Sequence, residues 1–232
     1  MKKTPIQFRV IFEKQHWHLL SLLVLLGCIY FIFRTNGFLT GKLFGLSTLT
    51  WTIIALANTI FHQVFVLIVW RLELYYQWIS KHFGKTGFVF YGIFFFIFFI
   101  ARLVLVIFLS LSNHETFSIN FIVKYVIAGI ITVPVIYTFY SVLRFFSIER
   151  ALGIDHFDHS YRNKQLERRG IYKITDNAMY IFGLLVLLIP GIIFSSKAAL
   201  AVGVFNYIYI WVHYFFTELP DMQYIYGSNK NE

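Results

Sequence analysis

The chain is poor in charge, and this shortage argues against a soluble globular protein. Charged residues make up only 13% of its 232 positions, against about 25% in a typical soluble domain. Hydrophobic residues make up 58% and aromatic residues 21%. This composition predicts a protein that crosses a membrane several times.

Cysteine is almost absent. The single cysteine, Cys28, lies inside an apolar run, so an intramolecular disulfide and a thiolate metal cluster are both excluded. The N-terminal residues are basic, but no small-residue cleavage site follows the first apolar stretch. That stretch is therefore predicted to be a retained helix and not a signal peptide.

Long apolar runs dominate what is present. A helix needs about 20 apolar residues to cross the hydrocarbon core, because each backbone polar group must be bonded within the segment. Six runs meet or approach this length: 17–33, 43–70, 87–112, 119–145, 178–194 and 198–216. We expect an all-α fold, a polytopic membrane helical bundle with about six transmembrane helices. The turn residues Pro190 and Gly191 separate the last two runs, which predicts a C-terminal helical hairpin.

Lysine and arginine gather on one side of this predicted bundle. With the N-terminus inside, the inner segments hold 15 of these residues and the outer loops hold three. Cytoplasmic loops carry this excess, so both termini and the 146–177 loop are expected in the cytoplasm. Anionic inner-leaflet lipid accounts for the net charge of +9, and no nucleic-acid partner is expected.

Two polar stretches flank the predicted hairpin. They are RRGIYKITDNAMY at 168–180 and HYFFTELPDMQYIYG at 213–227. Because the two helices are antiparallel, these stretches are expected to lie side by side at the membrane edge. Together they supply carboxylates, a histidine, an amide and aromatic faces, from Tyr172, Asp176, Asn177, Tyr180, His213, Tyr214, Glu218, Asp221 and Tyr224. Such a set suits a cationic ligand with polar arms, and S-adenosylmethionine carries a sulfonium cation and a carboxylate.

The same stretches resemble the signatures of the integral-membrane methyltransferases, which include the phospholipid and isoprenylcysteine carboxyl enzymes. The first stretch matches at Gly170, Tyr172, Asn177, Met179 and Tyr180. The second is similar to the ending of the phosphatidylethanolamine N-methyltransferases, at Glu218, Pro220, Asp221, Met222 and Gly227. The resemblance covers about the last 80 residues.

This resemblance implies S-adenosylmethionine as cofactor and a lipid substrate that enters from the bilayer. The cofactor-binding residues that it implies are Gly170, Tyr172, Asn177, Tyr180, His213, Glu218 and Asp221. Residues 146–232 would form the cofactor site from loop, hairpin and tail. Residues 1–145 would form a four-helix membrane scaffold with the lipid entrance, within a single structural domain.

One departure from the family pattern concerns the cofactor carboxylate. The family has Arg-His-Pro or Arg-Asn-Pro where this chain has Asp176-Asn177-Ala178, so an acid replaces the arginine. Either Lys173, Arg169 or Arg168 pairs with the carboxylate instead, or the cofactor is held differently, or activity has been lost.

Methyl transfer to a phospholipid amine, the leading acceptor, needs a base because an ammonium cannot attack. Glu218 and His213 are the candidates, and the sequence does not rank them. Five residues apart on an α-helix, they are separated by about 140° and share a face only if the helix breaks near Thr217. Pro220 predicts a helix end nearby. Isoprenylcysteine carboxyl and thiol acceptors stay open.

Ionisable residues within the spans need partners or a function. Arg71 and Glu73 either bind a lipid headgroup as substrate or form a structural ion pair. Arg102 either snorkels toward the membrane surface or, because it lies near the centre of its span, pairs with an acidic partner or a lipid phosphate. The stretch DHFDH at 155–159 fits a polar loop better than a metal site, and no metal is expected.

Two other functions stay open on the sequence alone. One is an NADPH-dependent membrane reductase of sterol-reductase-like architecture, with its nicotinamide cofactor in a similar pocket. The other is a non-catalytic relative that binds lipid or a partner membrane protein. Cofactor preference distinguishes them, and the sequence does not indicate an oligomeric state.

Overall fold

The structure, a computed structural model, describes residues 7–162 and 167–227. Within these ranges the fold is helical apart from one antiparallel strand pair, β1 (Lys42–Leu43) with β2 (Leu46–Ser47). The prediction of an all-α membrane bundle is confirmed.

Five helices in the described part are long and apolar enough to cross a membrane, by length and composition. They are α2 (Gln15–Phe33), α3 (Thr48–Tyr76), α5 (Thr86–Ser112), α6 (Phe121–Ser141) with the π-helical turn η1 (Val142–Phe146), and α11 (Lys197–His213) with its continuation. Shorter elements connect them: α1 (Phe8–Ile11), α4 (Trp78–Phe83), α7 (Ile148–Ala151), η2 (Ile154–His156), α8 (His159–Arg162) and η3 (Gly170–Lys173).

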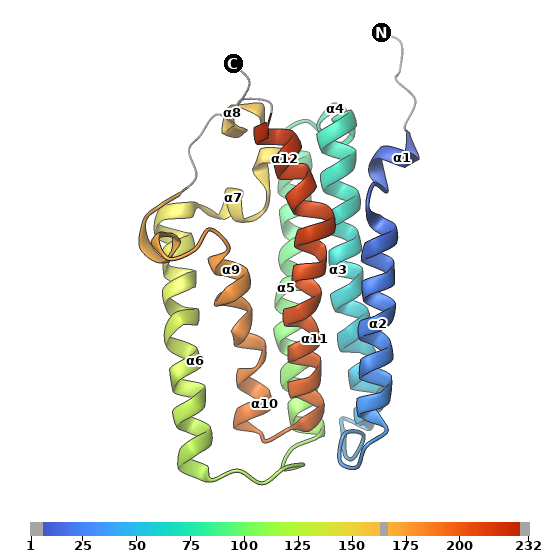
Figure 1. Cartoon of the computed structure of the whole chain (residues 1–232), viewed down its shortest axis with the longest axis vertical. Coiled ribbons are helices and arrows are strands. Elements are labelled where there is room, and N and C mark those ends of the chain that lie inside the picture. The colour runs from blue at the N-terminus through green and yellow to red at the C-terminus, as the bar shows by residue number, and fades with distance from the viewer. Residues whose placement is uncertain (1–6, 163–166, 228–232) are drawn as a thin grey trace.

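The predicted span 178–194 is wrong as one continuous helix. The chain forms three short pieces there, α9 (Ala178–Ile181), η4 (Gly183–Leu187) and α10 (Ile189–Ile193). Gly183 and the pair Pro190-Gly191 explain the interruptions, because glycine weakens a helix and proline lacks the amide donor. These pieces lie between α6 and α11 (Figure 1) and pack against both.

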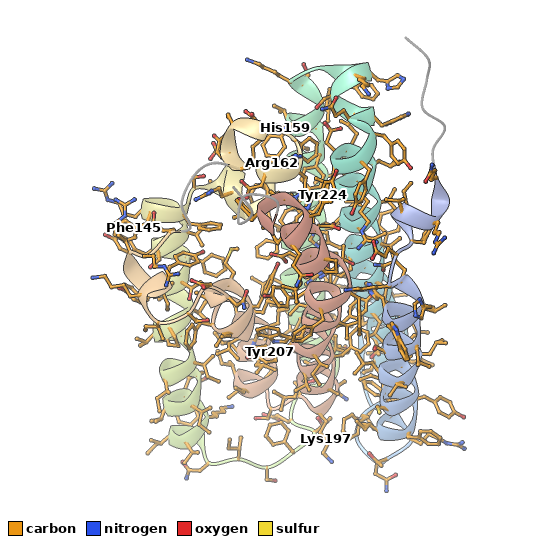
Figure 2. All side chains as sticks on the ribbon, turned by 45° about the horizontal axis from the view of Figure 1, so that its top comes forward. Phe145, His159, Arg162, Lys197, Tyr207 and Tyr224 are labelled. Atoms are coloured by element: carbon orange, nitrogen blue, oxygen red, sulfur yellow. The ribbon has the colours of Figure 1, made fainter. Side chains whose placement is uncertain are left out.

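The predicted C-terminal hairpin is confirmed, since α10 turns back directly into α11. Ser196 caps α11 by accepting from the amide of Ala199, 3.2 Å away. The side chain of Asn113 ties this turn to the rest of the bundle: its oxygen accepts from the Ala198 amide at 3.0 Å and its nitrogen donates to the Thr40 carbonyl at 2.8 Å. In Figure 2 Lys197, at this turn, lies at the opposite end of the molecule from His159 and Tyr224.

The last helix is longer than predicted. Instead of ending near residue 216, α11 passes through the π-helical turn η5 (Tyr214–Glu218) into α12 (Leu219–Gly227). The helix end predicted near Pro220 is therefore wrong. Pro220 is accommodated because the chain makes a wider turn just before it: the amide of Leu219 bonds to the carbonyl of Tyr214, five residues back.

The largest buried cluster lies where α2, α3, α5 and α11 meet, around Phe205 and Tyr209. The outward faces of the same helices carry large exposed apolar residues, such as Phe31 and Ile100. An apolar exterior is what helices in contact with lipid tails require, because hydrocarbon cannot hydrate polar side chains.

The loop after α6 docks on the indole of Trp70. Trp70 donates through Nε1 to the hydroxyl of Tyr91 at 2.8 Å and lies 3.3 Å from the carbonyl of Leu152. Gly153 follows with a φ of +79°, and a Cβ there would lie 2.6–2.8 Å from the Trp70 ring. Glycine is thus required at 153 both by the backbone conformation and by the close approach.

We predict that Gly153→Ala lowers the free energy of unfolding by at least about 2 kcal/mol, from left-handed backbone strain and overpacking. Thermal unfolding of the purified protein in detergent measures this. Gly129→Ala is the control, since Gly129 lies in α6 with nothing within 4 Å of an added Cβ. Equal stability of the two variants would refute the close packing of the loop on Trp70.

Candidate functional site

The two motifs meet across the hairpin at Tyr180 and Glu218. The hydroxyl of Tyr180, on α9, donates to Oε2 of Glu218, in η5. The Tyr180 ring also makes edge contacts with Trp211 and Tyr214, at centroid distances of 6.0 and 5.9 Å. The prediction that the ends of the hairpin lie side by side is confirmed here, and the Glu218 carboxylate bonds to the hydroxyl of one of three clustered aromatic residues.

His213 closes the last α-helical turn before η5 and is 1% exposed. Its ring lies 5.9 Å from Trp70 and 6.1 Å from His18, centroid to centroid. Neither ring nitrogen has a hydrogen-bond partner among the described residues. A buried histidine without partners is costly, so His213 is a candidate for contact with a bound ligand.

His213 and Glu218 serve different parts of the site. The π-helical turn between them inserts one extra residue per turn, and such turns are frequent at functional sites. No direct hydrogen bond joins the two side chains in the part of the chain that is described. Glu218 meets Tyr180, while His213 borders a cavity.

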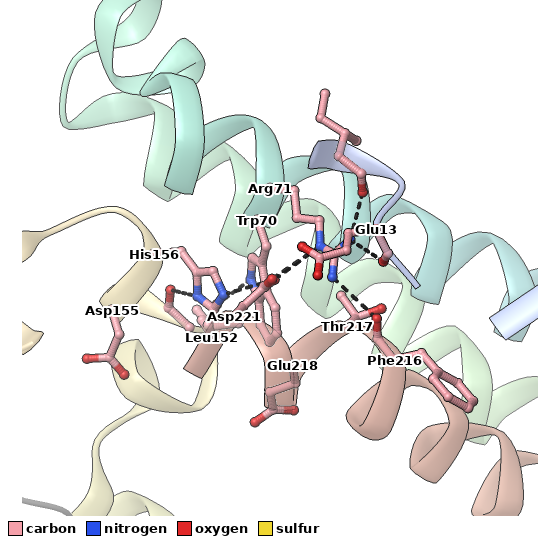
Figure 3. A network of polar contacts seen from close by, with 12 residues as sticks. Glu13, Trp70, Arg71, Leu152, Asp155, His156, Phe216, Thr217, Glu218 and Asp221 are labelled. Carbon is pink, nitrogen blue, oxygen red and sulfur yellow. Dashed lines mark hydrogen bonds and ion pairs between the residues drawn. The ribbon is translucent and has the colours of Figure 1, made fainter. Parts of the chain in front are cut away.

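Asp221 lies apart from this aromatic cluster, in a buried ion pair. It accepts from Nε of Arg71 at 3.2 Å, and Nε2 of His156 is 3.7 Å from its other oxygen. Arg71 and Asp221 are both 0% exposed. In Figure 3 the carboxylate of Glu218 points away from this pair. Asp221 therefore has a structural partner in Arg71, and its predicted contact with the cofactor stays a prediction.

Arg71 also holds three backbone carbonyls. It donates to Ile11 and Glu13, both at 2.8 Å, and to Phe216 at 3.3 Å (Figure 3). The Phe216 carbonyl is available because residue 220, four positions on, is a proline and offers no amide. Gln15 donates to the same carbonyl at 2.8 Å. The wide turn is therefore held from outside by α2 and α3.

The predicted ion pair between Arg71 and Glu73 is wrong. Glu73 instead accepts from the amides of Ile79 and Ser80, at 2.9 and 3.1 Å, and from the Ser80 hydroxyl. These bonds satisfy free donors at the start of α4, as a capping carboxylate does. Both predicted substrate residues are 0% exposed and occupied by the protein itself, so the structure gives no support for a lipid headgroup at either.

The start of the first motif packs on the inner end of α6. Gly170 has a φ of +59°, and a Cβ there would lie 2.6 Å from the Ser141 hydroxyl. The next amide, of Ile171, donates to that hydroxyl at 3.1 Å. Gly170 is therefore explained by close packing, and its predicted cofactor contact stays a prediction.

Tyr172 is 3% exposed and stacks on Phe146 at a centroid distance of 4.8 Å. Burial raises the pKa of its hydroxyl, and within the described chain that hydroxyl has no hydrogen-bond partner. The backbone carbonyl of Asn177 accepts the first bonds of α9. Tyr172 and Asn177 therefore both lie in the segment that leads to Tyr180, next to the end of the hairpin.

The exposed Asp176 stands where the family has arginine. Of the three cations that could replace it, Arg169 is engaged, because it pairs with Glu167 at 2.8 Å. Hydrogen bonds from Arg169 lower the pKa of Glu167 to about 2. Arg168 and Lys173, both exposed, are left to receive a ligand carboxylate.

A cavity of about 220 Å³ opens beside the cluster. Tyr180 and His213 border it, together with Trp70 and with two residues from the first half of the chain, His62 and Arg102. Its remaining walls are mainly apolar. An enclosed apolar cavity with a few converging polar groups is the usual form of a small-molecule site.

The sequence offered a partial signal for these first-half residues. Arg102 was conspicuous as a charge inside a span, but its contact with Nδ1 of His62, 3.0 Å away, replaces the expected acidic partner. Nothing in the sequence distinguishes Trp70 from the many other aromatic residues of the chain. Its importance comes from the loop after α6, which approaches the indole at Gly153 and stacks the ring of His156 on it at a centroid distance of 4.3 Å.

His156 and Asp155 come from the stretch DHFDH and serve this packing. Burial raises the pKa of Asp155, although the Arg150 guanidinium, 4.0 Å away, opposes the shift. No group of three or more potential metal ligands occurs among the described residues.

Comparison with known families agrees with the motif reading. The family model for phospholipid methyltransferase matches residues 123–229. The match begins in α6 and includes both motifs, and it confirms the resemblance predicted from the sequence. It supports a membrane methyltransferase. No curated protein and no solved structure matches the chain.

We predict that Asp221→Asn lowers the free energy of unfolding by about 3 kcal/mol or more, because it leaves the buried Arg71 guanidinium without its counter-ion. Denaturant unfolding in detergent measures the change. Glu115→Gln is the control, since that carboxylate is 83% exposed in the connection between α5 and α6; a change within about 0.5 kcal/mol is expected. A stable Asp221→Asn protein would contradict a structural role for the pair.

Proposed function

Given the match of residues 123–229 to the phospholipid methyltransferase family, we propose that this protein is an S-adenosylmethionine-dependent methyltransferase acting on a lipid amine within the membrane. The observation that carries the proposal is the contact of Tyr180 with Glu218. It joins the two motifs into one polar site at the edge of an apolar cavity.

The residues around this contact fit the cofactor. A carboxylate bonded to Tyr180, whose ring also contacts Trp211 and Tyr214, suits a sulfonium cation, through charge attraction and cation–π contact. The ring nitrogens of His213, which have no partner among the described residues, can form a hydrogen bond with the cofactor. When bound, S-adenosylmethionine supplies an electrophilic methyl group.

The cofactor carboxylate needs a cation, and we assign this role to Lys173. Arg169 already holds Glu167, and Asp176 has the wrong sign. Lys173 is exposed and follows directly on Tyr172 in η3. An ammonium there pairs with a carboxylate without the bidentate geometry of the arginine in the family pattern.

We assign the base to Glu218. Taking a proton from the lipid ammonium to this carboxylate removes one positive and one negative charge from an apolar site. A proton on His213 would instead leave the positive charge in the site, moved onto a ring that borders the same cavity as Arg102, which low polarity disfavours. His213 then orients ligand through its ring nitrogens. Transfer itself requires mainly alignment and exclusion of water.

We place this site on the cytoplasmic side, from the excess of basic residues in the inner segments. In Figure 1 α1 and α12 lie at the same end of the bundle, next to the loop elements α7 and α8.

The first test is binding of S-adenosylmethionine and S-adenosylhomocysteine to the detergent-purified protein by calorimetry. Micromolar binding is expected, weakened about tenfold in Glu218→Gln and in Tyr180→Phe, because each removes one partner of a charge-assisted hydrogen bond. Tyr125→Phe, at the outer end of α6, and Glu115→Gln are matched controls that should bind as the wild type does. Absence of binding by folded protein, or binding of NADPH in its place, would refute the proposal.

The second test is methyl transfer to phosphatidylethanolamine in nanodiscs. Glu218→Gln is expected to lower kcat by about 10²–10⁴-fold, as loss of a general base does. Its deficit should shrink as pH rises toward the pKa of the lipid amine, since solvent then removes the proton. A loss that is independent of pH would assign Glu218 to binding alone.

A further inference from the structure

A cationic side chain is buried inside the bundle without a carboxylate to balance it. Arg102, on α5, is 3% exposed. Among the described residues no acidic side chain lies within ion-pair distance of it. It donates a hydrogen bond from Nη2 to Nδ1 of His62 on α3, 3.0 Å away. A buried charge without a counter-ion is unfavourable, so this site calls for an anion.

The contact with Arg102 determines where His62 carries its proton. A guanidinium only donates, so Nδ1 of His62 accepts and the proton of the neutral ring lies on Nε2. Within the described chain neither that Nε2 nor Nε of Arg102 has a partner. The pair thus presents two buried N–H donors, which require an acceptor.

Both side chains border the cavity that also contains Tyr180 and His213. Because Tyr180 contacts Glu218, one ligand in this cavity has access to the Arg102–His62 pair and to the proposed transfer site. Between them the walls are apolar, formed by residues such as Phe95 and Phe99.

The cavity reaches the lipid-facing surface between α5 and α6. Four of its wall residues are also exposed on the outside: Phe96 on α5 (37%), Phe139 on α6 (37%), Leu143 in η1 (67%) and Ile148 in α7 (41%). Below the loop, α6 packs on α9 and α10 and stands away from α5 (Figure 1). Apolar chains of a ligand therefore have an exit to the bilayer.

We propose that Arg102 and His62 bind the phosphate of the acceptor lipid, whose acyl chains leave the cavity between α5 and α6. A guanidinium and an imidazole N–H together match the oxygens of a phosphodiester, the group that a phospholipid carries next to its amine. The lipid's role as acceptor rests on the proposed function, whereas the anion site does not. Both residues lie outside the segment that matches the family.

The test measures lipid binding without methyl transfer. Purified protein in neutral detergent is titrated with dioctanoyl phosphatidylethanolamine, dioctanoylglycerol and inorganic phosphate, and the unfolding midpoint is followed, since a ligand of the native state raises it. The phospholipid is expected to raise the midpoint and the uncharged lipid is not. Arg102→Met is expected to weaken phospholipid binding at least tenfold.

Arg102→Met and two further variants separate binding from folding. Arg102→Met removes an uncompensated charge, so its midpoint without lipid should equal or exceed that of the wild type; a structural arginine would lower it. Arg102→Lys keeps the charge but not the planar fork and should keep part of the lipid response. Lys124→Gln, which removes a cation at the outer end of α6, should leave the response unchanged.

Other results of these titrations would refute one of the two proposals. Equal responses to both lipids, or full phospholipid binding by Arg102→Met, would refute the phosphate site. A response to inorganic phosphate as large as that to the lipid would make it a free-anion site and refute the lipid assignment. Arg102-dependent lipid binding by a protein that does not bind S-adenosylmethionine would uphold the phosphate site and refute the methyltransferase proposal.

Discussion

The site depends on the buried guanidinium of Arg71. One side chain on α3 neutralises Asp221, holds the carbonyls of Ile11 and Glu13, and bonds the carbonyl of Phe216. It thereby fixes the start of the chain, the second membrane helix and the last helix relative to one another. Such a connection is strong inside a protein because a buried charge cannot exchange its partners for water.

The wide turn that Arg71 supports decides how the last helix presents its polar residues. Pro220 removes one amide, the turn widens, and the free carbonyl of Phe216 is taken up by donors from α2 and α3. His213 before the turn borders the cavity, while Glu218 at its end meets Tyr180. The proposed orienting group and the proposed base thus come from the two ends of this turn on one helix.

The cavity combines two sources of chemistry. The segment that matches the phospholipid methyltransferase family supplies His213 and Tyr180, which bonds to Glu218, and the first half of the chain supplies Arg102 and His62. The proposed division is that the family segment holds the cofactor and the first-half helices recognise the acceptor. Such a division allows acceptor specificity to change without disturbing the groups that position the methyl donor.

The sequence by itself determined the membrane bundle, the hairpin and the meeting of its two motifs, because hydrophobic run length, turn residues and antiparallel geometry are local properties. Only the tertiary structure decided which charges pair. Arg71 and Glu73 are neighbours in sequence, yet one pairs with Asp221 and the other caps α4. Pairing of buried ionisable groups depends on which helices pack together, and long-range packing leaves no periodic trace in the chain.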